Sequence, residues 1–232
     1  MKILVVGFGR SGTTLTYRTF VKHPEIKRGF LETCLLAFND KKNLYKNYPV
    51  FNNQNKGVVE KVIYSGDRIA KKGFVLNITI YDYCNMWLDY FGKEARIVQI
   101  IRHPLDTISS LIIKRGRRRK IRPDLKDITV TDIPLKERNE LAERYLYAVS
   151  KYPKMIASLK NTKTFKYEDM ILKPETIQNM FSFCNLGPGN HESLRKDRAF
   201  NYKRTDFKVE QSIGKVIKIF NEISDGVKYK GI

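Results

Sequence analysis

A loop of glycine, hydroxyl and arginine residues near the start of the chain has the composition of a phosphate-binding site. It follows a short apolar run and precedes a segment with helical spacing, and it consists of Gly7, Phe8, Gly9, Arg10, Ser11, Gly12, Thr13 and Thr14. A loop between a buried strand and a helix presents backbone N–H groups at the positive end of the helix, where anions bind favourably. A tight corner would explain the glycines alone, but not the crowding of hydroxyls and a cation there. The loop therefore predicts a phosphate site.

The type of phosphate follows from a residue that the loop lacks. Loops that bind ATP or GTP carry a lysine after the second glycine, and this lysine reaches the β- and γ-phosphates. Thr13 occupies that place here. Amides and hydroxyls without the lysine suit a shorter 5′-phosphate group, and the guanidinium of Arg10 offers a forked cation to whatever is attached to it.

A second anion site is predicted at the end of another apolar run, Ile97 to Ile101. Arg102 follows this run directly, and Ser110 comes about two turns into the next helical segment. Open α/β sheets bind ligands at the carboxyl ends of their strands. Arg102 and Ser110 could thus hold a second phosphate by charge and by hydroxyl donation, although a salt bridge and a helix-interior serine would produce the same pattern.

Together these motifs resemble the sulfotransferase superfamily. The string from Arg10 to Leu15 is similar to the superfamily's 5′-phosphosulfate loop, and Gly9 to Thr33 resembles the tyrosylprotein and carbohydrate sulfotransferases. Arg102 and Ser110 match the family's 3′-phosphate motif. The resemblance implies 3′-phosphoadenosine 5′-phosphosulfate (PAPS) as sulfuryl donor and adenosine 3′,5′-bisphosphate (PAP) as product, with no metal required. Two phosphate sites fit such a bisphosphate better than a triphosphate.

The same resemblance implies the catalytic groups. Glu32 matches the glutamate that accepts the acceptor's proton, although an acid at the start of a helix would look alike. Arg10 and Lys71 match the cations that stabilise charge on the transferring group. Lys72 is an alternative to Lys71, and an ordinary solvated lysine pair is another interpretation.

Two later motifs resemble donor contacts of the family. Tyr167, in Tyr167-Glu168-Asp169, resembles a tyrosine near the nucleotide whose acidic neighbours brace the loop, while Asp169 could also cap a helix. Lys215 resembles a late contact to the 3′-phosphate. His103 is next to Arg102, but we expect a packing role for it and no proton transfer.

The fold expected from the pattern is α/β, with a central parallel β-sheet flanked by helices, of the P-loop nucleotide-binding type. The expected strands are Ile3 to Val6, Ile97 to Ile101 and Thr164 to Tyr167, and the expected helices are Gly12 to Lys22, Ile80 to Phe91, Pro104 to Lys114 and Leu135 to Leu159. We expect a single domain over residues 1–232, with a surface excursion at 41–57, a lid at 115–134 and a flap at 186–214.

Charge and cysteine content indicate which partners and which cellular compartment to expect. The 232 residues include 44 basic and 24 acidic ones, a formal net charge of +20, which favours anionic partners. The basic run 114–120 would suit an acidic acceptor, but without interleaved aromatic residues it does not predict specific nucleic-acid binding. Three distant cysteines, Cys34, Cys84 and Cys184, indicate reduced thiols. Neither a signal-peptide pattern nor an apolar run long enough to span a membrane is seen, so we expect a cytoplasmic protein.

The sequence thus predicts a sulfotransferase that moves a sulfuryl group from PAPS to a hydroxyl of a carbohydrate, a tyrosyl peptide or a small alcohol or phenol. Two other hypotheses remain at this point. A P-loop kinase would need Lys71 or Lys72 as a displaced lysine, and a non-catalytic polyanion-binding protein would retain only the scaffold.

Overall fold

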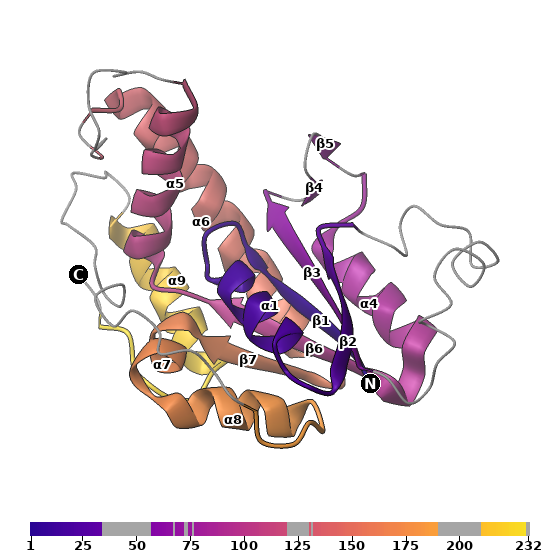
Figure 1. Cartoon of the computed structure of the whole chain (residues 1–232). Helices are drawn as coiled ribbons and strands as arrows, with labels where there is room; N and C mark the ends of the chain where they lie inside the picture. The colour runs from indigo at the N-terminus through magenta and orange to yellow at the C-terminus, as the bar shows by residue number, and fades with distance from the viewer. Residues whose placement is uncertain are drawn as a thin grey trace.

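Seven strands in the described part of the chain form one sheet, shown in Figure 1. The computed structural model describes residues 1–33, 57–66, 68–71, 74–75, 77–119, 130, 132–189 and 210–230, with the backbone alone at 70, 71, 74, 75, 116–119, 210 and 211. The strands are β1 (Lys2–Phe8), β2 (Ile26–Leu31), β3 (Gly57–Ser65), β4 (Arg68–Lys71), β5 (Phe74–Val75), β6 (Ala95–Ile101) and β7 (Thr162–Lys166).

The sheet is parallel in its centre and antiparallel at one edge. Its strand order is β5-β4-β3-β1-β6-β7, and β2 also pairs with β3. The pairs β1–β3, β1–β6, β2–β3 and β6–β7 are parallel, whereas β3–β4 and β4–β5 are antiparallel. The carboxyl ends of β1, β2, β3 and β6 therefore share one edge, where ligands of open α/β sheets bind.

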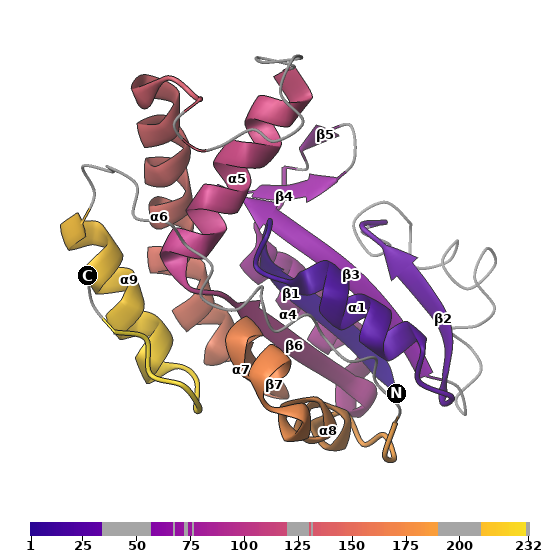
Figure 2. The ribbon, with the colours of Figure 1, turned by 60° about the vertical axis from the view of Figure 1, so that its left-hand side comes forward.

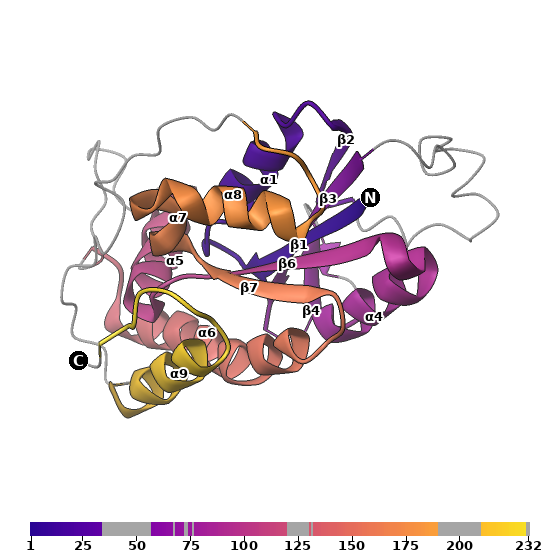
Figure 3. The same ribbon diagram turned by 90° about the horizontal axis from the view of Figure 1, so that it is seen from below.

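Helices cover both faces of the sheet, as Figure 3 shows from below. The helices are α1 (Thr13–Val21), α4 (Ile80–Phe91), α5 (Pro104–Arg119), α6 (Leu135–Ala157), α7 (Tyr167–Leu172), α8 (Pro174–Phe183) and α9 (Glu210–Glu222), with a 3-10 turn, η2 (Gly92–Glu94), after α4. Because strand side chains alternate, Leu4 and Val6 join the core beneath α4, α6 and α9, while Ile3 and Val5 join the core beneath α1, α7 and α8. Burial on both faces explains why β1 is a continuous apolar run.

One edge of β3 is divided between two partners. Its first half pairs with β2, whose last residue, Leu31, lies opposite Lys61, and its second half pairs with β4 from Ile63 onward. The chain leaving β2 must turn away at this junction. As a result Glu32 lies at the gap between β2 and β4, on the ligand-binding edge.

The predicted fold class is confirmed, with corrections to individual elements. Tyr167 begins α7 and does not end a strand, and α5 runs five residues beyond Lys114 into the expected lid, because arginine is a good helix former. The last part of the expected flap, 210–214, forms the first turns of α9. The sequence interpretation missed β3, whose apolar run is interrupted by Glu60 and Lys61.

Other expectations concern residues outside the described part of the chain: most of the excursion at 41–57, most of the lid, and the flap from 190 to 209. Among the described residues, none of the helices combines the length and apolar character needed to cross a membrane.

Candidate functional site

The loop of residues 7–14 turns sharply from β1 into α1. Two residues have left-handed backbone conformations, Arg10 with φ 77° and Gly12, the N-cap of α1, with φ 105°. The N–H of Ser11 donates to the carbonyl of Phe8 at 3.0 Å, which closes the turn. The first turn of α1 carries no acidic residue. Its backbone N–H groups and the positive end of the helix dipole are therefore presented without a competing carboxylate.

Close packing around the loop requires its glycines and leaves a buried hydroxyl. A Cβ at Gly7 would lie 2.6 Å from the carbonyl oxygen of Ile100, and one at Gly12 would lie 2.3 Å from the ring of Tyr167. The Oγ of Ser11 is buried and has no hydrogen-bond partner among the described residues. A buried hydroxyl of this kind normally finds a partner, so the loop fits a bound phosphate oxygen.

The second predicted anion site has a well-held arginine. Arg102 Nη2 lies 3.5 Å from the buried carboxylate of Asp106, one turn into α5. The guanidinium also stacks on Tyr167, with its carbon 4.6 Å from the ring centroid. These two contacts restrict the orientation of Arg102 at the carboxyl end of β6, while a side-chain exposure of 15% leaves it accessible to a ligand.

The structure brings the two predicted sites into direct contact. Arg10 Nε, in the loop, donates a hydrogen bond of 2.8 Å to Ser110 Oγ, on α5. These residues are one hundred positions apart in sequence. The loop, Arg102 and Ser110 therefore belong to one cationic region of the sheet edge.

Glu32 is tied to this region through Lys61, a buried lysine of β3. Lys61 Nζ lies 2.6 Å from Glu32 Oε1 and 3.0 Å from Thr14 Oγ1, so a single ammonium group joins the predicted base to the phosphate loop. Glu32 has a left-handed backbone, with φ 55°, and its N–H donates to the Lys61 carbonyl at 2.8 Å. Such strained backbone in a non-glycine residue is typical of functional sites.

An acidic residue of β3, Glu60, holds the turn at Glu32 and Thr33 from the opposite face of the sheet. Glu60 is fully buried, and its carboxylate accepts hydrogen bonds of 2.7 Å from Thr33 Oγ1 and from the hydroxyl of Tyr83. Because Glu60 and Lys61 are adjacent in a strand, they point to opposite faces. The Glu32-Thr33 turn is thus held from both sides.

The sequence interpretation did not single out Lys61, and it assigned the catalytic lysine to Lys71, with Lys72 as the alternative. Lys71 is the last residue of the antiparallel β4, where only its backbone is described, and Lys72 lies outside the described residues. The signal that could have identified Lys61 is a lysine inside an otherwise apolar run of strand length. Lys215 is exposed on α9, and within the described chain no hydrogen bond or ion pair joins it to Arg102 or Ser110.

The histidines and cysteines of the described residues belong to the packing of the molecule. His103 is buried, and burial, assisted by the nearby Arg102 charge, lowers its pKa to about 4 despite a hydrogen bond with the backbone of Lys230. His23 bonds to the carbonyl of Gly187. Cys84 and Cys184 are buried, free thiols whose pKa values are raised by burial, as expected. The remaining cysteine and histidine, Cys34 and His191, lie outside the described residues.

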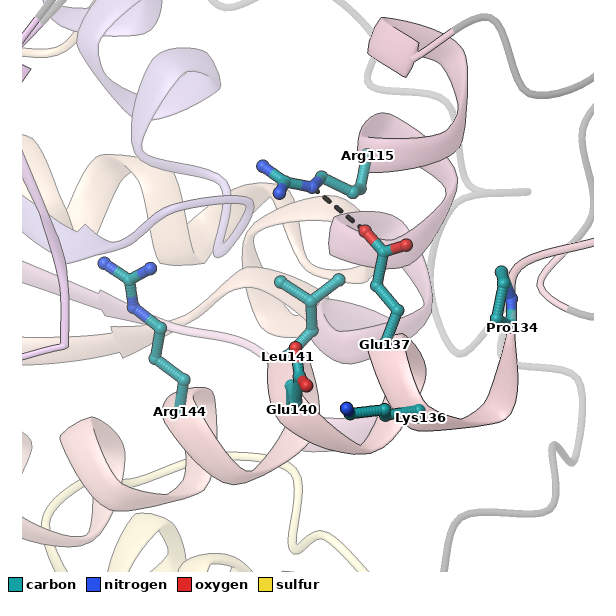
Figure 4. A pocket seen from close by; sticks show the side chains of 7 residues that line it. All are labelled: Arg115, Pro134, Lys136, Glu137, Glu140, Leu141 and Arg144. Atoms are coloured by element: carbon teal, nitrogen blue, oxygen red, sulfur yellow. Dashed lines mark hydrogen bonds and ion pairs between the residues drawn. The ribbon is translucent and has the colours of Figure 1, made fainter.

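A cavity of about 430 Å³ adjoins this edge between α5 and α6, as shown in Figure 4. Arg115 and Arg144 line it with Leu141 between them, and Arg115 Nε pairs with Glu137 at 3.0 Å. Arg144 also donates to the carbonyl of Ser65 at 3.2 Å, at the end of β3. The cavity wall is thereby fixed close to the loop, whose Gly9 N–H bonds to the preceding carbonyl of β3.

A comparison with protein families decides the family of the chain. The family model described as "Sulfotransferase domain" matches residues 1–226, which is nearly the whole chain. The chain belongs to the sulfotransferase domain family. The predicted superfamily is thereby confirmed, and the phosphate loop lies within the matched region.

Two solved sulfotransferase structures align with most of this chain. It is similar to the sulfotransferase domain from the curacin biosynthetic pathway, with 12% identity, a TM-score of 0.61, and coverage of 94% of this chain and 96% of that one. A mouse sulfotransferase solved in complex with PAP aligns with 15% identity, a TM-score of 0.48, and coverage of 96% and 82%. A search of curated proteins gave no match. Among the residues that the structure describes, no cluster of three His, Cys, Asp or Glu side chains could hold a metal ion.

Proposed function

We propose that this sulfotransferase uses PAPS as its donor and transfers the sulfuryl group to a hydroxyl of the acceptor, releasing PAP. The observation that supports the proposal is the hydrogen bond between Arg10 and Ser110, because it joins the predicted phosphate loop to a residue of the predicted second anion site. A donor with phosphates at both its 5′ and 3′ positions would occupy both at once.

The donor contacts follow from the position of each group. The backbone N–H groups at the start of α1, with the hydroxyls of Ser11, Thr13 and Thr14, would surround the 5′-phosphosulfate. Arg102 and Ser110 would hold the 3′-phosphate by charge and by hydroxyl donation. Tyr167 lies between the two sites, against Gly12 and beneath Arg102, as a platform for the nucleotide.

The chemistry is an in-line displacement at sulfur. The acceptor oxygen forms a bond to sulfur while the bond from sulfur to the bridging phosphate oxygen breaks, and PAP leaves with the electron pair. Glu32 takes the acceptor's proton. Arg10 and Lys61 stabilise the charge that develops on the sulfuryl group and on the leaving phosphate. Lys61 takes the role that the sequence assigned to Lys71, because its ammonium contacts both Glu32 and the loop.

For the acceptor, we propose a compound that carries an anionic group and binds toward the cavity between α5 and α6. Three basic side chains, Arg115, Lys136 and Arg144, outnumber the two acidic ones, Glu137 and Glu140, that line this space (Figure 4). Guanidinium groups bind carboxylate and sulfate favourably. A sulfated or carboxylated saccharide and an acidic tyrosyl peptide both meet this description.

The experiment is a transfer assay with PAPS and matched acceptor pairs. Each pair contains an acidic hydroxyl compound and its neutral analogue, for example a tyrosyl peptide with flanking aspartates and one with asparagines. Release of PAP is measured in the presence of a metal chelator. We expect turnover with the chelator present and a preference for acidic acceptors. No PAP release with any acceptor would contradict the proposed activity, and equal rates within the pairs would contradict the proposed acceptor class.

A further inference from the structure

The segment that follows α9, residues 224–230, lies across the beginning of α7. We call it the 224–230 strap. Its attachment is polar: Lys166 Nζ donates to the carbonyl of Val227 at 2.7 Å, and the N–H of Val227 donates to both carboxylate oxygens of Asp169, at 3.1 and 3.2 Å. A Cβ at Gly226 would collide with the carboxylate of Asp169, so the backbone of the strap lies close against this side chain. Figure 2 shows α9 beside α6, with the strap passing from it toward α7.

Tyr229 is the most firmly held residue of the strap. Its side chain is buried, and Asn221 of α9 bonds to its backbone on both sides, accepting from the N–H and donating to the carbonyl, each at 2.9 Å. Its ring contacts the imidazole of His103 edge-on, with 5.2 Å between centroids. These contacts direct the Tyr229 hydroxyl inward.

The hydroxyl of Tyr229 donates a hydrogen bond to Glu168, which is fully buried. The other carboxylate oxygen of Glu168 accepts the backbone N–H of His103 at 2.9 Å. His103 directly follows Arg102, the predicted ligand of the 3′-phosphate. A continuous set of hydrogen bonds therefore leads from the strap to the backbone that carries Arg102.

A buried carboxylate needs both of these partners. Removing one donor from a buried acceptor costs the desolvation of the freed group, and the carboxylate then shifts or recruits water to recover a partner. Any such shift of Glu168 would move the backbone at His103. The effect on the phosphate loop should be smaller, because the Ser11 N–H to Phe8 carbonyl bond closes the loop's own turn and its contact with this region is through the ring of Tyr167.

We propose that Tyr229 is a positioning residue for the second anion site: through Glu168 and the N–H of His103, it fixes Arg102 for the 3′-phosphate of the donor. This inference rests on the proposed function, since it assigns a 3′-phosphate to Arg102. It also accounts for the full burial of Glu168, whose two carboxylate oxygens bond to Tyr229 and to the N–H of His103.

The test uses two ligands that differ only in the 3′-phosphate, titrated calorimetrically against the full chain. Tyr229→Phe removes the hydroxyl and keeps the ring. We expect its affinity for PAP to fall roughly tenfold, because losing a hydrogen bond to the Glu168 carboxylate weakens the positioning of Arg102. The affinity for adenosine 5′-monophosphate should stay within about twofold. Tyr147→Phe, an exposed tyrosine on α6, is the matched control and should change neither affinity.

The outcomes distinguish a failure of the positioning role from a failure of the proposed function. An equal loss for both ligands would show a general loosening of the structure and would overturn the positioning role, as would an unchanged affinity for PAP. If Tyr229→Phe does not fold, Asn221→Ala, which releases the same residue from α9, takes its place with the same two criteria. Failure of the unaltered chain to bind PAP would instead refute the proposed function itself.

Discussion

Replacing Lys61 by methionine tests the link between the proposed base and the phosphate loop. Methionine keeps most of the apolar stem of the side chain but removes the ammonium, and with it the contacts of 2.6 Å to Glu32 and 3.0 Å to Thr14. A hydrogen bond from a charged donor contributes roughly 1.5–3 kcal/mol. If about 3 kcal/mol of this is specific to the transition state, kcat falls roughly a hundredfold.

Binding and turnover must respond differently if this reasoning is correct. We expect Lys61→Met to bind PAP within a few-fold of the unaltered chain, because Arg102, Ser110 and the loop amides remain. Lys163→Met removes an exposed strand lysine of β7 and serves as the control, with unchanged kcat. Turnover of Lys61→Met within threefold of the original would refute the role of Lys61, and so would a loss of PAP affinity as large as the loss of kcat.

Three further changes have defined outcomes. Glu32→Gln keeps the shape of the side chain but cannot accept a proton, so PAP binding should persist while turnover falls at least a hundredfold; retained turnover would remove Glu32 from the mechanism. His103 has a pKa lowered to about 4, so below pH 6.5 the unfolded chain binds a proton that the folded chain does not, and stability is lost as the pH falls. Between pH 7.5 and pH 5 the unfolding free energy in urea should fall by about 2 kcal/mol more than in His103→Gln, and parallel curves would disprove this. Arg144→Ala should raise KM for an acidic acceptor and leave PAP affinity unchanged, and the reverse pattern would exclude the cavity as the acceptor site.

The positions of the loop and of Arg102 in the fold could be predicted because their signals are local. Gly7 and Gly12 follow a continuous apolar run and precede a helix. In the structure the backbone carbonyl of Ile100 in β6 leaves no room for a Cβ at Gly7, and the ring of Tyr167 in α7 leaves none at Gly12. Arg102 was placed correctly at the end of β6 by the same strand-then-polar pattern. The contact of Arg10 with Ser110 then follows from the parallel pairing of β1 with β6.

The contribution of β3, with Glu60 and Lys61, could not be predicted because its signal is not local. Glu60 and Lys61 interrupt the apolar pattern of β3, so the run did not indicate a buried strand. In the structure both find partners distant in sequence: the Glu60 carboxylate accepts hydrogen bonds from Thr33 and Tyr83, and the Lys61 ammonium pairs with Glu32. Buried charges inside a strand thus concealed both the strand and the proposed role of Lys61.

The most direct measurement of the central claim compares two nucleotides at the same edge of the sheet. The unaltered chain is titrated calorimetrically with PAP and, separately, with Mg-ATP. A two-phosphate site built from the loop, Arg102 and Ser110 predicts that PAP binds more tightly, that magnesium does not change its affinity, and that Arg102→Ala weakens PAP binding at least tenfold. Tighter binding of Mg-ATP, or affinity for PAP that is indifferent to Arg102, would contradict the account.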